Sequence, residues 1–91
     1  MSKKRLLVVD DDELIREVAT SCLELNATWV IEQARSGREA LELASTSPPD
    51  AILLDVMMPE WDGPETLTRL RDIPQLKRVP VIFLTAKVGR L

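Results

Sequence analysis

Four residues of this chain combine reactive side chains with positions suited to metal or phosphate chemistry. Each follows a continuous apolar run: Asp10 and Asp11 follow residues 6–9, Asp55 follows residues 51–54, and Thr85 follows residues 81–84. An aspartate persists beside such a run only where it is paired, solvated or used. These residues are therefore the candidates for a functional site.

The chemistry that three carboxylates favour is the binding of a hard divalent cation, which takes oxygen ligands. The chain contains no histidine, so the carboxylates make a poor general acid–base site. Mg²⁺ commonly takes one or two protein carboxylates and keeps positions for water and phosphate oxygens. A bound cation would offset the repulsion among the carboxylates, and a carboxylate could then attack phosphorus to form an aspartyl phosphate. The Thr85 hydroxyl could donate to a phosphoryl oxygen.

A simpler role is open to each of these residues. A single aspartate after a strand usually caps a helix or forms a turn, and we expect Asp12 to be such a cap. Threonine is common in strands, so Thr85 alone indicates little. The convergence of three acidic residues at one place is what favours a cation site.

The spacing of apolar residues predicts alternating strands and helices. We expect strands over residues 5–10, 29–34, 50–55 and 79–86. The first helix should cover residues 13–25 and stop at Asn26. The second should open on the capping box of Ser36 and Glu39. The third should be capped by Asp62 or Gly63, begin near Pro64 and end before Pro74.

This β-α-β-α-β-α-β order predicts an α/β fold with parallel strands and right-handed crossovers. The carboxyl ends of parallel strands share one edge of the sheet, where open α/β sheets bind their ligands. Asp10, Asp11, Asp55 and Thr85 should therefore meet at this edge.

The apolar residues of the first helix lie on one broad face. Its main stripe consists of Leu14, Val18, Cys22 and Leu25, and beside it lie Ile15, Ala19 and Leu23. We expect Cys22 to be a small core residue rather than a reactive thiol. In the loop after Asp55, we expect Trp61 to be partly buried.

Length and composition limit the remaining possibilities. Residues 1–91 suffice for one domain, and a single cysteine without histidine excludes an internal disulfide, a Cys/His zinc site and a His-based triad. The net charge of −3 is too mild to suggest a nucleic-acid or membrane partner. The basic start at Lys3, Lys4 and Arg5 should simply be solvated. With no signal peptide or apolar run long enough to span a bilayer, we expect a cytoplasmic protein.

Three segments together resemble the receiver domain of two-component response regulators. They cover residues 7–12, residues 53–59 with the pair Asp62 and Gly63, and residues 81–86. The resemblance follows the whole chain in order and spacing. It implies a flavodoxin-like, CheY-like fold with strand order 2-1-3-4 over the four expected strands.

The resemblance also implies roles for individual residues. Asp55 would accept a phosphoryl group from the phosphohistidine of a sensor kinase or phosphotransfer protein. Asp10, Asp11 and Asp55, with the main-chain carbonyl of Met57, would hold Mg²⁺. Thr85 would be the switch hydroxyl that follows the phosphoryl group, and the main-chain N–H of Ala86 would help to hold it. Such a domain takes part in its own phosphoryl transfer but is not a dedicated enzyme.

The match departs from the family in length. Family members have five βα units, whereas this sequence contains three and a fourth strand, so we expect a truncated receiver without the last helix, strand and helix. The lysine that ends strand five in the family then has no counterpart, and Lys87 does not match it. An exposed fourth strand and first-helix face would favour a homo-oligomer.

Two other functions compete with phosphoryl acceptance. A shortened receiver could act only as a protein-interaction or dimerisation module. A phosphatase of the haloacid dehalogenase type also uses a nucleophilic aspartate after a strand, and residues 10–12 contain its D-x-D spacing. The threonine or valine expected next is missing, and the chain is too short for the other motifs, which weighs against this class.

Overall fold

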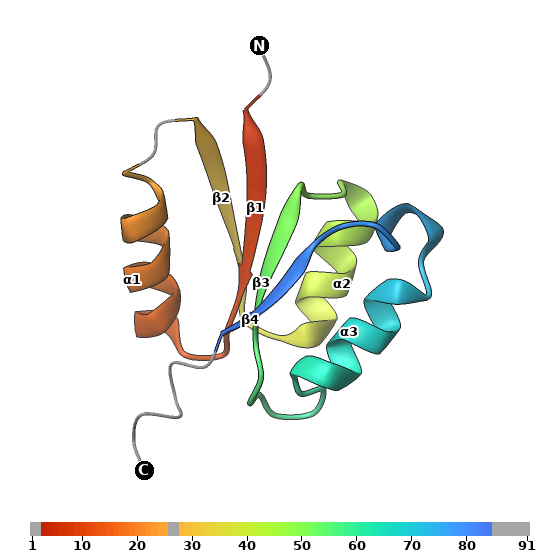
Figure 1. The fold of residues 1–91 in the computed structure, drawn as a ribbon. Helices are drawn as coiled ribbons and strands as arrows, with labels where there is room; N and C mark the ends of the chain where they lie inside the picture. Colours follow the sequence, from red (N-terminus) through yellow and green to blue (C-terminus); the bar gives the residue numbers. More distant parts are fainter. Residues whose placement is uncertain (1–2, 26–27, 85–91) are drawn as a thin grey trace.

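A computed structural model describes residues 3–25 and 28–84 of the chain (Figure 1). Strands and helices alternate along the sequence, as expected. The strands are β1 (Lys4–Val9), β2 (Trp29–Ala34), β3 (Ala51–Asp55) and β4 (Val81–Leu84). The helices are α1 (Glu13–Leu23), α2 (Gly37–Thr46) and α3 (Gly63–Arg71), followed by a short 3₁₀ turn at Pro74–Leu76 that the sequence did not predict.

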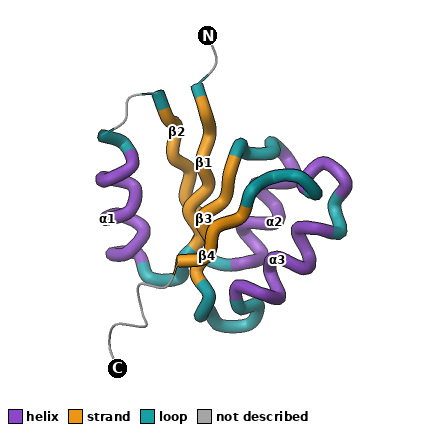
Figure 2. Tube along the Cα trace, viewed as in Figure 1, coloured by secondary structure: helices purple, strands orange, loops and turns teal. Residues whose placement is uncertain are grey.

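All four strands are parallel and form one sheet in the order β2-β1-β3-β4. This confirms the predicted flavodoxin-like α/β fold. Helix α1 covers one face of the sheet, while α2 and α3 cover the other (Figures 1 and 2). Every strand therefore ends at the same edge, which Figure 2 shows at the bottom, where the loops leading into α1 and α3 begin.

The main core lies between the sheet and the pair α2 and α3. It consists of apolar side chains that are almost fully buried, namely Leu7, Val9, Ala34, Ala40, Ala44, Ile52, Leu54, Met58, Leu70 and Leu76. Helices α2 and α3 approach so closely that a Cβ atom on Gly37 would lie 2.2 Å from the Thr66 hydroxyl. Only glycine fits at this crossing, which fixes α3 and the loop before it against α2.

Side chains at the helix starts confirm three predicted caps. Asp12 accepts hydrogen bonds from the main-chain N–H groups of Leu14 and Ile15, and so begins α1. The Ser36 hydroxyl accepts from the Glu39 N–H, and the Asp62 carboxylate accepts from the Glu65 N–H. All three caps lie in loops that follow a strand at the carboxyl edge of the sheet, and they hold those loops in place.

The orientation predicted for α1 is wrong in part. The stripe of Ile15, Ala19 and Leu23 lies half-buried against the sheet, whereas Leu14 and Val18 are 67% and 55% exposed. Cys22 shares their side of the helix and is exposed, so it is not a core residue. The two stripes are neighbours on one helix, and periodicity could not decide which of them faces the sheet.

The remaining predictions concern the basic start of the chain, three residues at or beyond the ends of elements, and a membrane span. Arg5 is hydrogen-bonded and half-buried rather than simply solvated, since it crosses the amino-terminal edge of the sheet. Asn26, Thr85 and Ala86 lie outside the described residues. Among the helices that the structure describes, none is long and apolar enough to cross a bilayer.

Candidate metal and phosphoryl site

The register of the sheet brings the predicted carboxylates together. Val9 pairs with Leu54 across β1 and β3, so the next residues, Asp10 and Asp55, are neighbours at the carboxyl edge. Oxygen atoms of Asp10, Asp11 and Asp55 all lie within 4.8 Å of one another. The structure thus assembles the three acidic residues that the sequence singled out.

The three carboxylates differ in their exposure to solvent. Asp10 and Asp55 are 1% and 2% exposed, while Asp11 is exposed. Removing a carboxylate from water is costly unless another charge or hydrogen bonds compensate it. Two buried carboxylates beside a third, accessible one form an arrangement that fits a cation arriving from solvent with part of its water shell.

The turn between β1 and α1 holds Asp10 through several hydrogen bonds. Its carboxylate accepts from the Asp12 N–H at 2.9 Å. Its main-chain N–H donates to the Ala34 carbonyl of β2 at 3.1 Å, and its carbonyl accepts from the Arg16 guanidinium at 2.7 Å. Arg16 was not among the residues that the sequence singled out, because nothing in its spacing shows that it reaches back to the turn.

The loop between β3 and α3 forms the other side of the site. The Met57 N–H donates to the Asp55 carboxylate at 3.3 Å, and the Gly63 N–H closes the loop on the Val56 carbonyl at 2.8 Å. A Cβ atom on Gly63 would lie 2.7 Å from the Asp55 carbonyl oxygen and 2.9 Å from the Val56 Cα. Glycine at this position is therefore what lets α3 start directly beside Asp55.

Trp61 braces the same loop against α2 and α3. Its ring is half-buried, as predicted, and lies between the guanidinium groups of Arg38 and Arg69, at 4.7 Å and 4.1 Å from the ring centroid. Arg38 also pairs with Glu60 at 3.3 Å. Glu60 has a φ of 65°, a left-handed conformation that is uncommon without a glycine. The arginines thus hold a sharply turned loop.

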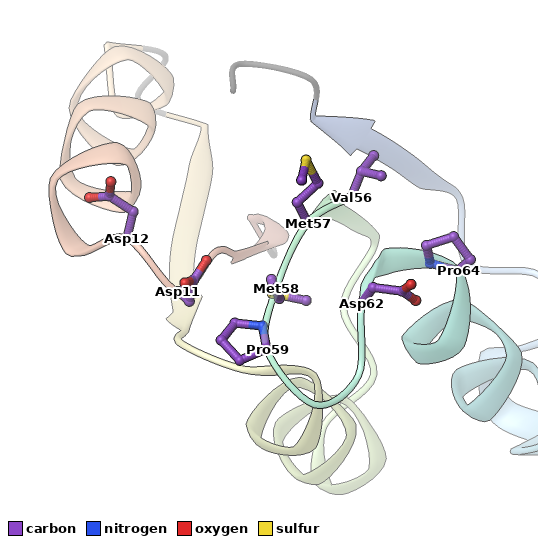
Figure 3. Close-up of a pocket in the computed structure, with 8 residues that line it drawn as sticks. All are labelled: Asp11, Asp12, Val56, Met57, Met58, Pro59, Asp62 and Pro64. Carbon is purple, nitrogen blue, oxygen red and sulfur yellow. The ribbon is translucent and has the colours of Figure 1, made fainter. Parts of the chain in front are cut away.

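A cavity of about 730 Å³ opens between the two loops (Figure 3). Asp11 and Asp12 lie on one side of it, and Asp62 and Pro64 lie on the other, with Pro59 below. Its lining consists of Asp11, Asp12, Val56, Met57, Met58, Pro59, Asp62 and Pro64. The cavity gives a ligand access to the acidic group from solvent.

The described residues test the remaining site predictions only in part. Met57 lines the cavity, which agrees with a ligand role for its main-chain carbonyl, although that role stays a prediction. Asp12 caps α1, as expected, and is not a member of the acidic group. Thr85 and Ala86 lie outside the described residues, so their predicted contacts with a phosphoryl group stay predictions.

Comparison with known families decides what this arrangement is. Residues 6–90 match the family model of the response regulator receiver domain. This chain belongs to that family. The "Response regulator MprA" of Mycolicibacterium vanbaalenii is 45% identical to it over 83 residues, and that of Mycobacterium ulcerans is 43% identical over 83 residues.

Solved receiver structures share the fold. The N-terminal domain of a response regulator receiver protein from Methanoculleus marisnigri matches 90% of this chain with a TM-score of 0.85 and 43% identity. Chemotaxis protein CheY4 of Vibrio cholerae matches 97% with a TM-score of 0.83 and 30% identity. The receiver domain of the histidine kinase CKI1 from Arabidopsis thaliana, in complex with Mg²⁺ and BeF₃⁻, matches 96% with a TM-score of 0.79 and 32% identity.

The matches cover more of this chain than of its relatives. The alignment with the M. vanbaalenii protein spans 91% of this chain but 35% of that protein. The alignments with the M. marisnigri and V. cholerae structures span 66% and 76% of those chains. The similarity to the M. vanbaalenii protein therefore concerns about a third of that protein's length.

Proposed function

We propose that this receiver domain accepts a phosphoryl group on Asp55 in two-component signalling. The observation that carries the proposal is the acidic group, in which Asp55 is buried to 98% beside Asp10 and Asp11. Asp11 of this group lines an open cavity. Membership of the receiver family supports the same assignment. The donor would be the phosphohistidine of a sensor kinase or of a phosphotransfer protein.

The acidic group fits Mg²⁺, and its residues define how the ion would be held. Asp10, Asp11 and Asp55 would supply carboxylate oxygens, and Met57 would supply its main-chain carbonyl. When bound, the ion supplies positive charge that offsets both the carboxylates and the charge on the transferring group. The similar CKI1 receiver was solved with Mg²⁺ and BeF₃⁻, which supports the same pair of ligands here.

The transfer step needs little from the protein beyond position and charge. An Asp55 carboxylate oxygen attacks phosphorus, the phosphorus–nitrogen bond to the donor imidazole breaks, and its electron pair returns to that imidazole. The hydrogen bond from the Met57 N–H orients Asp55 for this attack. We expect Thr85 and the Ala86 N–H to contact the transferred group, and we regard the domain as a phospho-acceptor of the cytoplasm rather than a dedicated enzyme.

Phosphodonor labelling tests this proposal. The chain is incubated with Mg²⁺ and a small phosphodonor such as phosphoramidate, and intact-mass spectrometry follows the addition of one phosphoryl group. Asp55→Asn should abolish the addition, while Asp72→Asn, which alters an exposed carboxylate at the far end of α3, should leave it unchanged. Labelling that persists in Asp55→Asn would refute the assignment.

A second function, as an interaction module, is favoured by a separate surface. Helix α1 and the end of β4 enclose a cavity of about 340 Å³ lined only by apolar residues, namely Leu14, Ile15, Val18, Ala19 and Leu84. Exposed apolar surface of this kind favours association, and β4 lies at an edge of the described sheet. We propose that copies of the chain associate through this surface. Sedimentation equilibrium should then show an oligomer that Val18→Glu converts to a monomer.

A further inference from the structure

The side chain of Arg16 connects α1 to the acidic group. It projects back along the helix, and its Nη1 donates to the Asp10 carbonyl at 2.7 Å. Its Nε donates to the Gln33 side-chain oxygen at 3.1 Å. The guanidinium is half-buried and joins the ends of β1, β2 and α1. Arg16 is not among the residues that line the cavity between the two loops.

Hydrogen bonds anchor Asp10 at its main-chain N–H, its carboxylate and its main-chain carbonyl. The Ala34 carbonyl accepts from its main-chain N–H, and the Asp12 N–H donates to its carboxylate. Ala34 directly follows Gln33, the other partner of Arg16. Arg16 thus fixes the one remaining main-chain polar group of Asp10, its carbonyl. The N–H and the carbonyl of Asp10 belong to the two peptide groups that flank its Cα, and both are anchored. Because the Asp12 N–H also holds the carboxylate, its direction is set before a ligand arrives.

We propose that Arg16 is a positioning residue for the cation site, acting through the main-chain carbonyl of Asp10. This inference rests on the Mg²⁺ part of the proposed function. Groups that orient a metal ligand, without touching the metal, commonly matter to affinity almost as much as the ligands themselves. Arg16 does this through a main-chain carbonyl and leaves the carboxylate of Asp10 to face the other acidic residues.

A purely electrostatic role for Arg16 makes the opposite prediction. A fixed positive charge near the site repels a divalent cation, so its removal alone would strengthen Mg²⁺ binding. Loss of positioning would weaken binding, because Asp10 would have to be ordered when the ion binds. The sign of the change therefore separates the two roles.

Isothermal titration of the 91-residue chain with Mg²⁺ is the deciding experiment. Arg16→Gln should weaken Mg²⁺ binding about tenfold, as loss of a ligand-orienting group does. Gln33→Leu keeps the charge of Arg16 and its bond to the Asp10 carbonyl but removes the partner of its Nε, and it should produce a smaller weakening. Arg35→Gln is the matched control: Arg35 lines the same small surface cavity as Arg16 and Gln33 and pairs with Glu39, so its loss removes a nearby charge and should not weaken binding.

Hydrogen exchange measured without Mg²⁺ distinguishes a local loss of positioning in Arg16→Gln from a general loss of stability. Hydrogen exchange by NMR reports the Asp12 N–H, which donates to the Asp10 carboxylate. In Arg16→Gln this amide should exchange faster, while amides within β3 keep their wild-type rates. An unchanged Asp12 rate would contradict the positioning role.

The outcomes for the two proposals differ. Wild-type binding that Asp10→Asn abolishes, together with tighter or equal binding by Arg16→Gln, would overturn the positioning role alone. A wild-type chain that bound no Mg²⁺ would overturn the proposed function and this inference with it. Weaker binding by both Arg16→Gln and Gln33→Leu, with Arg35→Gln not weakened, would establish Arg16 as a positioning residue.

Discussion

The two edges of the sheet treat their charges in opposite ways. At the amino-terminal edge, the guanidinium of Arg5 bonds to polar groups of opposite charge or polarity. It pairs with Glu32 at 2.7 Å and donates to the carbonyls of Ser47 and Pro48. Its main-chain N–H donates to the Asp50 carboxylate at 2.7 Å, and the Asp50 N–H donates back to the Arg5 carbonyl. Opposite charges and hydrogen bonds are thus balanced within the protein.

At the carboxyl-terminal edge, like charges are gathered instead. Asp10, Asp11 and Asp55 approach within 4.8 Å, and two of them are almost fully buried. Both edges use the same parallel strands, so the sheet itself does not require this crowding. The amino edge is therefore built for stability, whereas the carboxyl edge stores an electrostatic cost that a bound cation can relieve.

The largest effect is expected from a methyl group at the carboxyl edge. Gly63→Ala places a Cβ atom 2.7 Å from the Asp55 carbonyl and 3.0 Å from the Phe83 ring, so backbone must move. We expect a loss of about 3 kcal/mol in the free energy of unfolding, measured by urea denaturation, together with weaker Mg²⁺ binding. Pro64→Ala alters the next, exposed residue and should cost far less. A Gly63→Ala variant of wild-type stability would mean that the close approach is not a real constraint.

A smaller effect is expected from breaking the amino edge. Arg5→Met keeps much of the apolar length of the side chain but removes its hydrogen bonds to Glu32, Ser47 and Pro48. Because the charged groups are partly open to solvent, we expect a loss of about 2 kcal/mol. The increase in stability that Mg²⁺ produces should be the same as in wild type, since the acidic group lies at the other edge. Thermal unfolding with and without Mg²⁺ measures both quantities, and a lost Mg²⁺ response would show that the edges are coupled.

Much of the fold and the central site could be predicted from the sequence for a simple reason. Continuous apolar runs indicate strands buried on both faces, and parallel strands end at one edge. Residues 29–34 were predicted as a strand and form β2. The same rule predicted that Asp10 and Asp55 are neighbours, because it requires only that the two strands lie side by side in matching register.

Features that depend on side-chain direction could not be predicted in this way. Arg5 and Arg16 look like ordinary surface residues in the sequence. Yet Arg5 reaches the main-chain carbonyl of Pro48, far away in the sequence, and Arg16 reaches that of Asp10 in the preceding turn. Cys22 lies on an apolar stripe that turned out to face away from the sheet. In each case the deciding quantity is the rotation of a helix or side chain, and spacing along the sequence does not contain it.

The smallest expected effect is the most informative about the difference between the edges. Asp10→Asn keeps the shape of the side chain and an oxygen that can accept from the Asp12 N–H, but it removes one of the three crowded charges. Without Mg²⁺ the variant should be more stable than wild type by about 1 kcal/mol, since close carboxylates repel strongly when buried.

With Mg²⁺ the order should reverse. At about ten times its dissociation constant, an ion that binds only the folded wild type adds about 1.4 kcal/mol to the free energy of unfolding, while Asp10→Asn should gain almost nothing. Urea denaturation in EDTA and then in Mg²⁺ measures both differences on the same two proteins. Asp50→Asn at the amino edge is the control: it loses a balanced carboxylate, so it should be less stable than wild type in both buffers. If Asp10→Asn also lost stability in EDTA, the carboxyl edge would be as balanced as the amino edge, and the cost attributed to its crowded charges would not exist.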